Sequence, residues 1–336
     1  MKILVTGSAG FMASHLVDAL LDEGHDVVGV DDLSGGSLRN LEEAQKRRKG
    51  KFTFVRGNLQ DPVVCNHVVQ GCNVVYHLAA YAAEGQSVFS PCAINDINVR
   101  PMNNLLVASV NNDVKRFVFT SSMAVYGHQI PPFSERMPRE PVDPYGIGKT
   151  YCESMLESFS NLHGLDYTII RPHNVFGERQ NTADPFRNVI GIWMNMMLLG
   201  KRPYIYGDGR QTRAFSYIRN ITPCMVEAMK CKSGEIINLG GEEERTINDV
   251  YKVVKVAMNS NLDALNTTDR LGEVKHAYCT NDKARGILGY RDTWSLEAGI
   301  MKMAEWIREL GPQKPSYRIP LEIEKNAPIT WRNRLI

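Results

Sequence analysis

Short segments that are continuously apolar alternate with segments of helical periodicity through the first half of this 336-residue chain. The apolar segments are rich in Val and Ile, and they lie at residues 2–7, 26–32, 52–57, 73–80, 116–122 and 166–172. The helical patterns lie at residues 11–24, 94–112 and 145–163. A strand that is apolar on both faces needs helices on both sides of its sheet, as in buried parallel sheets. The sequence therefore predicts the α/β class with a doubly wound parallel sheet.

The alternation loosens after residue 175. Residues 188–203 have a Met-rich apolar pattern that predicts a helix, and residues 235–241 predict one more strand. We interpret the methionines as core packing, because flexible side chains fill irregular gaps. The rest of the chain indicates a smaller, mostly helical C-terminal lobe.

Composition and charge exclude several classes of protein. The net charge of +2 gives no electrostatic basis for binding nucleic acid. No apolar run reaches the ~20 residues that a membrane-spanning helix needs, and the first residues have no signal-peptide pattern. The seven cysteines form no C-x-x-C pair, which predicts free thiols in a reducing compartment rather than disulfides or zinc. We therefore expect a cytoplasmic protein that binds no nucleic acid, membrane or metal.

A glycine turn joins the first predicted strand to the first predicted helix. In "VTGSAGFMASH", Gly7 makes the tight turn and Gly10 leaves room for a pyrophosphate at the start of the helix. Ala13 stands at the third position of the dinucleotide fingerprint and lets the helix pack close to the strand. The free N–H groups of a helix N-terminus bind phosphates. The turn therefore predicts a dinucleotide site in a Rossmann domain.

An acidic residue follows at the end of the second predicted strand. Asp31 lies ~20 residues beyond the turn, where a carboxylate accepts hydrogen bonds from an adenosine ribose. A carboxylate there repels a 2′-phosphate, which favours NAD over NADP as the cofactor. We assign the adjacent Asp32 to the same site, with its carboxylate in solvent.

Two side chains in "DPYGIGK" lie four residues apart at the start of a predicted helix. Tyr145 and Lys149 therefore share one helix face, and an ammonium near a phenol lowers the pKa of the phenol. A bound nicotinamide cation acts in the same direction, so the tyrosine can work as a base near neutral pH. Ser122 ends the apolar segment "KRFVFTSS" at the carboxyl edge of the sheet, where ligands bind. We expect Ser122 to hydrogen-bond the substrate hydroxyl that Tyr145 deprotonates.

Six sequence blocks, in their order along the chain, are similar to blocks of the extended short-chain dehydrogenase/reductase family. They are "TGSAGFMASHL", "HLAA" (77–80), "TSSMAVYG", "DPYGIGK", "RPHNVFG" (171–177) and "IYGDGRQTRAFSYI" (205–218). Within this family the chain resembles the nucleotide-sugar epimerases, with the closest likeness to the UDP-glucose 4-epimerases. The resemblance runs over nearly the whole chain.

The resemblance implies a mechanism in which Ser122, Tyr145 and Lys149 are the catalytic set. Tyr145 takes the proton from the 4-hydroxyl of the sugar while carbon 4 passes a hydride to NAD. The 4-keto sugar turns over and regains the hydride on its other face, which inverts carbon 4. Lys149 also holds the nicotinamide ribose, and NAD stays tightly bound because each cycle regenerates it.

The resemblance also extends the cofactor site. Its expected members are Gly7, Gly10, Phe11, Met12, Asp31, Asp32, Asn58, Leu59, Leu78, Ala79, Ala80, Asn98, Ser121, Tyr145, Lys149 and Pro172. Asn58 stands where the family usually has Asp near the adenine, and an amide can still accept a hydrogen bond from the adenine amine. Pro172 and His173 stand where many epimerases have aromatic residues beside the nicotinamide.

For a nucleotide-sugar substrate, which we expect to be UDP-linked, the resemblance assigns a second set of residues. They are Ser122, Met123, Tyr145, Asn174, Asn188, Val189, Arg213, Arg270 and Glu273. Arg270 stands where the family has an arginine for phosphate, and Glu273 where it has an acid for ribose. A planar guanidinium suits a diphosphate because it binds two oxygens. Tyr278 stands near the family's screen for bulk at carbon 2, which predicts poor turnover of N-acetylhexosamines.

The same likeness sets the expected domains and assembly. Residues 1–175, completed by a segment near 215–245, form the NAD-binding Rossmann domain. Residues 176–214 and 246–336 form the nucleotide-sugar-binding lobe. The helices predicted at 94–112 and 145–163 correspond to a pair that often forms a dimer interface in this family, so we expect a homodimer.

Related enzymes catalyse other reactions on this scaffold. The 4,6-dehydratases have an Asp–Glu pair, and the decarboxylases a Glu, where this chain has Met123 and Ala124. The absence of these acids favours reaction at carbon 4 alone. It leaves open UDP-glucose or UDP-galactose, a UDP-uronic acid, a UDP-N-acetylhexosamine, another nucleotide-sugar dehydratase or oxidoreductase, and a non-catalytic NAD-sensing protein. The roles of Glu84 and His173 stay open as well.

Overall fold

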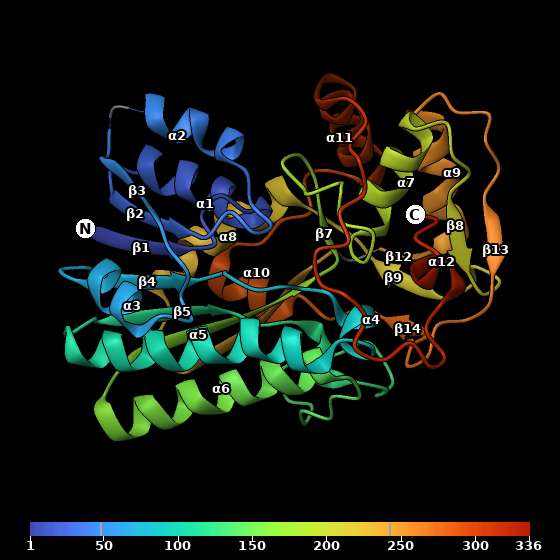
Figure 1. Ribbon diagram of the computed structural model, residues 1–336. Helices are drawn as coiled ribbons and strands as arrows, with labels where there is room; N and C mark the ends of the chain where they lie inside the picture. Colours follow the sequence, from blue (N-terminus) through green and yellow to red (C-terminus); the bar gives the residue numbers. More distant parts are fainter. Residues whose placement is uncertain (48, 242) are drawn as a thin grey trace.

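A parallel sheet organises the computed structural model, which describes residues 1–47, 49–241 and 243–336 (Figure 1). Within these residues its seven strands lie in the order β11 (Glu235–Gly240), β6 (Asp166–His173), β5 (Arg116–Thr120), β4 (Val74–His77), β1 (Lys2–Thr6), β2 (Asp26–Asp31) and β3 (Phe52–Arg56). All neighbouring strands are parallel. The predicted doubly wound parallel sheet is confirmed, and the strand expected at 235–241 is its last member.

Helices cover both faces of the sheet, because its strands are apolar on both sides. One face carries α1 (Phe11–Asp22), which packs against α8 (Ile218–Glu227), with α2 (Glu42–Lys46) beyond it. The other face carries α3 (Pro62–Val69), α5 (Pro91–Asn111) and α6 (Pro144–His163), and Figure 1 shows α5 and α6 side by side there. Ile3 and Val5 of β1 enter the core under α1, whereas Leu4 enters the core under α5.

The C-terminal lobe is mostly helical, as expected. Its helices are α7 (Val189–Leu198), α9 (Ile247–Ala257), α11 (Leu296–Leu310) and α12 (Ile329–Arg332), whereas α10 (Asp282–Leu288) packs beside β11. Short strands complete it: β7 (Val175–Phe176), β8 (Tyr204–Tyr206), β9 (Thr212–Ala214), β10 (Ser216–Tyr217), β12 (Glu244–Thr246), β13 (Leu265–Thr267) and β14 (His276–Ala277). In the described part of the chain, no helix combines the length and apolarity needed to cross a membrane.

The helix predicted at 188–203 is shorter than expected. It ends at Leu198, and Gly200 follows in the left-handed conformation, with φ of +69°. Glycine adopts this conformation without steric cost, so it stops helices readily. The remaining residues then lead into β8.

A strap of chain after α11 returns across the molecule to the loop before α5. Gln86 and Ser90 donate side-chain hydrogen bonds to the carbonyl oxygens of Ile319 and Pro320, both at 2.9 Å. The backbone N–H of Ile323 donates to the carbonyl of Phe89, also at 2.9 Å. These bonds fix residues 84–87, which form the short helix α4 (Glu84–Ser87), beside the start of α6.

The start of α6 is fixed by a buried cap. The carboxylate of Asp143 accepts hydrogen bonds from the backbone N–H of Gly146 at 2.9 Å and from the hydroxyl of Ser87 at 3.3 Å. Burial raises the pKa of Asp143, and the nearby carboxylate of Glu84 raises it further. The cap therefore fixes the first turn of α6, although burying the charged carboxylate of Asp143 near Glu84 is energetically unfavourable.

A buried ion pair fixes the middle of α6 to the sheet. Arg171 of β6 binds Glu153 of α6 through two hydrogen bonds, of 2.9 and 2.6 Å, and both side chains are almost fully buried. The hydroxyl of Ser121 donates to the same carboxylate, and Arg139 adds a bond of 3.3 Å. The phenol oxygen of Tyr126 accepts a further bond from Arg171 at 2.7 Å.

Replacing Glu153 by Ala should lower the free energy of unfolding by about 3–5 kcal/mol, because the guanidinium of Arg171 would stay buried without its partner. Urea unfolding followed by circular dichroism measures the change. Glu157→Ala is the matched control, because Glu157 lies one turn later, is partly exposed and, among the described residues, forms an ion pair only with Arg139; it should cost about 1 kcal/mol or less. Equal losses in the two variants would contradict this account.

Replacing Asp143 by Asn should change how stability depends on pH. Because the folded state raises the pKa of Asp143, it binds this proton more tightly than the unfolded chain, so the wild type loses stability as pH rises above about 4. Asn caps a helix equally well and carries no such proton. Urea unfolding at pH 5 and pH 8 should show Asp143→Asn gaining relative to the wild type by about 1 kcal/mol or more at the higher pH. A constant difference across this range, or the same gain in Asp61→Asn at the exposed cap of α3, would refute it.

Candidate active site

A cavity of about 470 Å³ opens beyond the carboxyl ends of β1, β2, β4 and β5. At its floor Gly7 has φ of +67°, and a Cβ there would lie 2.9 Å from the Cα of Ala79. Gly10 precedes α1 without any side-chain cap, so the first N–H groups of the helix stay open to the cavity. This open helix start is what a pyrophosphate needs.

Asp31 connects the end of β2 to the glycine turn. Its carboxylate accepts hydrogen bonds from the backbone N–H groups of Ala9 at 3.0 Å and Leu33 at 2.8 Å. Burial raises the pKa of Asp31, and the two bonds oppose this effect. A carboxylate can accept about four hydrogen bonds, so it retains capacity for ribose hydroxyls.

The expected cofactor residues gather in this cavity with one exception. The lining includes Gly7, Gly10, Phe11, Met12, Asp31, Asp32, Asn58, Leu59, Leu78, Ala79, Ala80, Ser121, Tyr145, Lys149 and Pro172. Asn98 does not line it, because its side chain is buried and holds the backbone of Tyr81 by bonds of 2.7 and 3.2 Å. Asn98 therefore supports the loop after β4 and does not face a cofactor. Ser121 lines the cavity, but its hydroxyl donates a hydrogen bond to the carboxylate of Glu153.

Sequence reasoning missed several residues of this cavity. Arg187, before α7, and Arg318, from the strap, both line it. Neither belongs to a local motif, so the sequence carried no signal for them. The glycines of "SGG" at 34–36 did have a recognisable sequence signal, because they follow the acidic end of β2. A Cβ on Gly36 would lie 2.7 Å from the backbone of Ala9, so this loop touches the glycine turn.

The proposed catalytic side chains meet at one end of this cavity. The hydroxyl of Ser122 accepts a bond from the N–H of Ala124 at 3.1 Å, and Ser122 lines the cavity together with Tyr145. Tyr145 lies in the first turn of α6 and is 6% exposed. Lys149, one turn later, donates to the carbonyl of Thr120 at 2.8 Å, and its Nζ lies 5.8 Å from the centre of the Tyr145 ring.

Burial dominates the electrostatics of this pair. It raises the pKa of Tyr145 well above the usual range, although the hydroxyl of Ser122 acts in the opposite direction. It also lowers the pKa of Lys149 to about 8. Within the chain itself, the effect of burial on the pKa of Tyr145 is therefore larger than that of any neighbouring group. An acidic phenol requires further positive charge at this place.

A second cavity, of about 240 Å³, lies beside the first, toward the C-terminal lobe. The expected substrate residues Met123, Asn174, Asn188, Val189, Arg213, Arg270 and Glu273 line it, whereas Ser122 and Tyr145 line the first cavity. Asn188 has φ of +62° and its side chain does not cap α7, so the amide remains available. Asn174 uses its amide N–H to hold the carbonyl of Ala214 at 2.9 Å.

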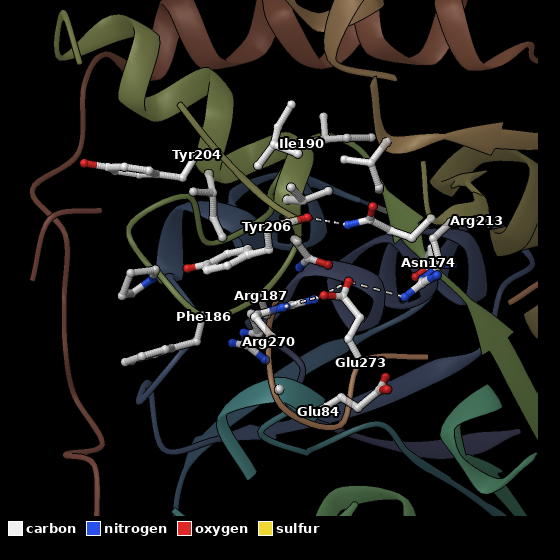
Figure 2. Close-up of a pocket in the computed structure, with 18 of the residues that line it drawn as sticks. Glu84, Asn174, Phe186, Arg187, Ile190, Tyr204, Tyr206, Arg213, Arg270 and Glu273 are labelled. Atoms are coloured by element: carbon white, nitrogen blue, oxygen red, sulfur yellow. Dashed lines mark hydrogen bonds and ion pairs between the residues drawn. The ribbon is translucent and has the colours of Figure 1, made fainter. Parts of the chain in front are cut away.

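Glu273 lies between the two arginines of the second cavity (Figure 2). Its carboxylate is 2.9 Å from Arg270 and 3.6 Å from Arg213. Arg270 also lies over the ring of Tyr206, 5.0 Å from its centre. Arg213 donates to the carbonyl of Val274 at 2.6 Å, so its guanidinium is held in place.

Two further expectations can be compared with the structure. His173 is fully buried and lines neither cavity, and burial lowers its pKa to about 3, so it stays neutral. Tyr278 also lines neither cavity. The argument from Tyr278 against N-acetylhexosamines therefore has no geometric basis. Glu84, in contrast, lines both cavities.

Comparison with known proteins adds independent support. The model of the NAD dependent epimerase/dehydratase family matches residues 3–240. The putative UDP-glucose 4-epimerase of Methanocaldococcus jannaschii is 34% identical over 309 residues, which cover 91% of this chain and 98% of that protein. UDP-glucose 4-epimerase of Thermotoga maritima, solved with UDP-glucose, is 32% identical with a TM-score of 0.84, covering 92% of this chain and 99% of that one.

A third relative carries the dinucleotide itself. UDP-glucuronic acid 4-epimerase of Bacillus cereus, solved with UDP-glucuronic acid and NAD, is 29% identical with a TM-score of 0.85, covering 92% of this chain and all of that one. In the present structure the open start of α1, the close approach at Gly7 and the carboxylate of Asp31 fit the same dinucleotide. The chain thus belongs to the NAD dependent epimerase/dehydratase family, and its cofactor is NAD.

Proposed function

We propose that this protein is an epimerase that inverts carbon 4 of a UDP-linked hexose of the glucose/galactose type, through a transient 4-keto sugar. The main support is the position of Ser122 and Tyr145 in the dinucleotide cavity, next to a second cavity that holds two arginines. A sugar placed between the cavities has its nucleotide on the arginine side and its reacting carbon near the phenol. Relatives named as UDP-glucose 4-epimerases support this substrate, while relatives of similar identity are named for UDP-glucuronic acid and UDP-N-acetylglucosamine.

The chain supplies the proton transfer. Bound NAD⁺ would supply the hydride acceptor and a positive charge beside the phenol. Tyr145 accepts the proton of the 4-hydroxyl, Ser122 hydrogen-bonds the same oxygen, and the ammonium of Lys149, held by Thr120, stabilises the phenolate. Because burial raises the pKa of Tyr145, the positive charge of bound NAD⁺ would help the phenol to act as a base.

The arginine pair supplies the anchor for the diphosphate. Arg213 and Arg270 share the carboxylate of Glu273 in this structure. Phosphate oxygens can replace that carboxylate as the partner of both guanidinium groups, since each presents planar donors to two oxygens. Glu273 is then released toward the ribose hydroxyls, as the family resemblance implies. The bound nucleotide fixes where the sugar can turn over.

Replacing Tyr145 by Phe should abolish the reaction and leave substrate binding intact, because the phenol oxygen is the proton acceptor. Wild-type protein incubated with UDP-galactose, without added NAD, should form UDP-glucose, and the variant should be at least ~10²–10³ slower. Isomer-resolving chromatography with mass detection measures the products, and calorimetry measures binding.

Tyr167→Phe is the matched control, because Tyr167 is the second residue of β6 and lines neither cavity. It should keep wild-type activity. Full activity in Tyr145→Phe would refute the assignment. A product lighter by one water would indicate a dehydratase, and stoichiometric consumption of NAD would indicate a net oxidoreductase.

We also propose that the protein forms a homodimer through α5 and α6. Val107 of α5 and Ile147 of α6 are large apolar side chains that are more than half exposed, at 51% and 54%. Tyr151, one turn after Ile147, is 40% exposed and hydrogen-bonds with Asn103 of α5, which lies one turn before Val107. These side chains therefore form one apolar face across the two helices.

Light scattering at micromolar protein should give twice the chain mass of 37.8 kDa. Ile147→Asp combined with Val107→Asp should give the monomer, because two buried charges cannot be accommodated in an apolar interface. Val63→Asp is the control, since Val63 of α3 is 73% exposed and lies outside this face. A monomeric wild type would contradict the proposal.

A further inference from the structure

The wall shared by the two cavities is where the sugar must lie if the proposed function holds. Ala82, Glu84, Met123, Asn174, Val175, Arg187 and Asn188 line both cavities. Most of these residues are uncharged. Among the described residues of this shared wall, Glu84 is the one anion and Arg187 the one cation. The chemistry of the sugar end therefore depends on these two charges.

Arg187 is already engaged by the protein. Its Nε lies 3.0 Å from the carboxylate of Asp184, and its guanidinium lies over the ring of Tyr81, 4.9 Å from the centre. Its positive charge is therefore offset by Asp184 within the same loop. It offers little attraction to a further anion on the sugar.

Glu84, unlike Arg187, is not neutralised by a neighbouring side chain among the described residues. Its side chain is partly exposed, and its carboxylate has no hydrogen-bond or ion-pair partner within the described part of the chain. Figure 2 shows this carboxylate on the Arg213 side of the pocket, away from Tyr204 and Phe186. It interacts electrostatically with Arg213 and Arg270, but those two share Glu273 and are the anchor for the diphosphate.

A second carboxylate lies behind Glu84. Asp143 is buried at the start of α6, lines the smaller cavity and interacts with Glu84 through the charge of the latter. Burial raises the pKa of Asp143, so Glu84, beside an arginine that Asp184 already offsets, is the main source of negative charge at the sugar end of the site. The nucleotide end, with Arg213 and Arg270, has the cationic groups.

We propose that Glu84 determines which sugar the enzyme accepts: its carboxylate accepts a hydrogen bond from a hydroxyl of a neutral hexosyl group and repels a sugar that carries a carboxylate at carbon 6. The proposal rests on the proposed function, because it needs the sugar at the shared wall. Inversion at carbon 4 requires the 4-keto sugar to turn over, so that first one face of the ring and then the other faces the cofactor. The group at carbon 6 therefore occupies two different places along this wall during one reaction cycle. A second anion would meet the field of Glu84 in at least one of them.

The test is the ratio of two affinities. Calorimetry on the purified wild-type protein should give a dissociation constant for UDP-glucuronate at least about tenfold weaker than for UDP-glucose. Glu84→Gln keeps the shape and a hydrogen-bonding oxygen but removes the charge. This substitution should lower the dissociation constant for UDP-glucuronate by about tenfold and change the dissociation constant for UDP-glucose by less than about threefold.

Two controls separate this effect from others. Glu309→Gln removes one negative charge at an exposed position of α11 and should leave the ratio unchanged. Glu84→Ala also removes the charge and should shift the ratio in the same direction, which covers a failure of the Gln variant to fold. An unchanged ratio in both Glu84 variants, or a wild type that binds the two ligands equally, would overturn the proposal.

Binding and turnover answer different questions here. If no sugar is interconverted but the affinity ratio shifts as expected, the role of Glu84 holds and the proposed reaction fails. If UDP-glucose is interconverted but the ratio does not shift, the reaction holds and the role of Glu84 fails. With activity in place, kcat/KM for UDP-glucuronate should rise in Glu84→Gln by the same factor as the affinity.

Discussion

The buried carboxylate of Glu153 is the interaction on which the geometry of the catalytic end depends. Tyr145, Lys149 and Glu153 follow one another at intervals of four residues, so they lie on the same face of α6. Glu153 binds Arg171 of β6 and Ser121, the residue that follows β5. A rotation of the helix that moved the phenol away from Ser122 would also withdraw this carboxylate and leave a buried guanidinium unpaired. The ion pair therefore fixes the rotation of α6 about its axis, and with it the position of the Tyr145 phenol at the carboxyl ends of the strands.

Most of the sheet could be predicted from the sequence, because the signals are local. Each apolar segment is itself a strand, and the turn from Gly7 to Gly10 lies within a few residues of the helix that it opens. The same locality explains the failure at Asn98. The family resemblance placed it in the cofactor site, but its partner is the backbone of Tyr81, seventeen residues earlier in the chain. Arg318 was missed for the same reason, because only the fold brings the strap to the cavity.

Depth of burial was the second quantity that the sequence could not supply. The spacing of Tyr145 and Lys149 correctly placed the ammonium near the phenol, with 5.8 Å between Nζ and the centre of the ring. Proximity alone implied a lowered phenol pKa, but burial raises it, and it lowers the pKa of the lysine as well. Desolvation penalises both charged forms and is the largest influence on the pKa of each group. Spacing along the helix predicts that two groups are neighbours, but their depth of burial comes from the whole fold.

The distribution of charge along the two cavities also sets the direction in which a substrate can bind. In the proposed function Arg213 and Arg270 lie at the nucleotide end, and phosphate oxygens replace their shared partner Glu273. Glu84 lies in the wall shared by the two cavities, where it interacts electrostatically with both arginines but has no ion-pair partner in the described residues. In this proposal the two guanidinium groups attract the diphosphate and the carboxylate of Glu84 repels it, so one polarity of binding is favoured. Because that polarity leaves the hexosyl group between Glu84 and Tyr145, the residue that orients the substrate also contacts the part of it that varies among nucleotide sugars.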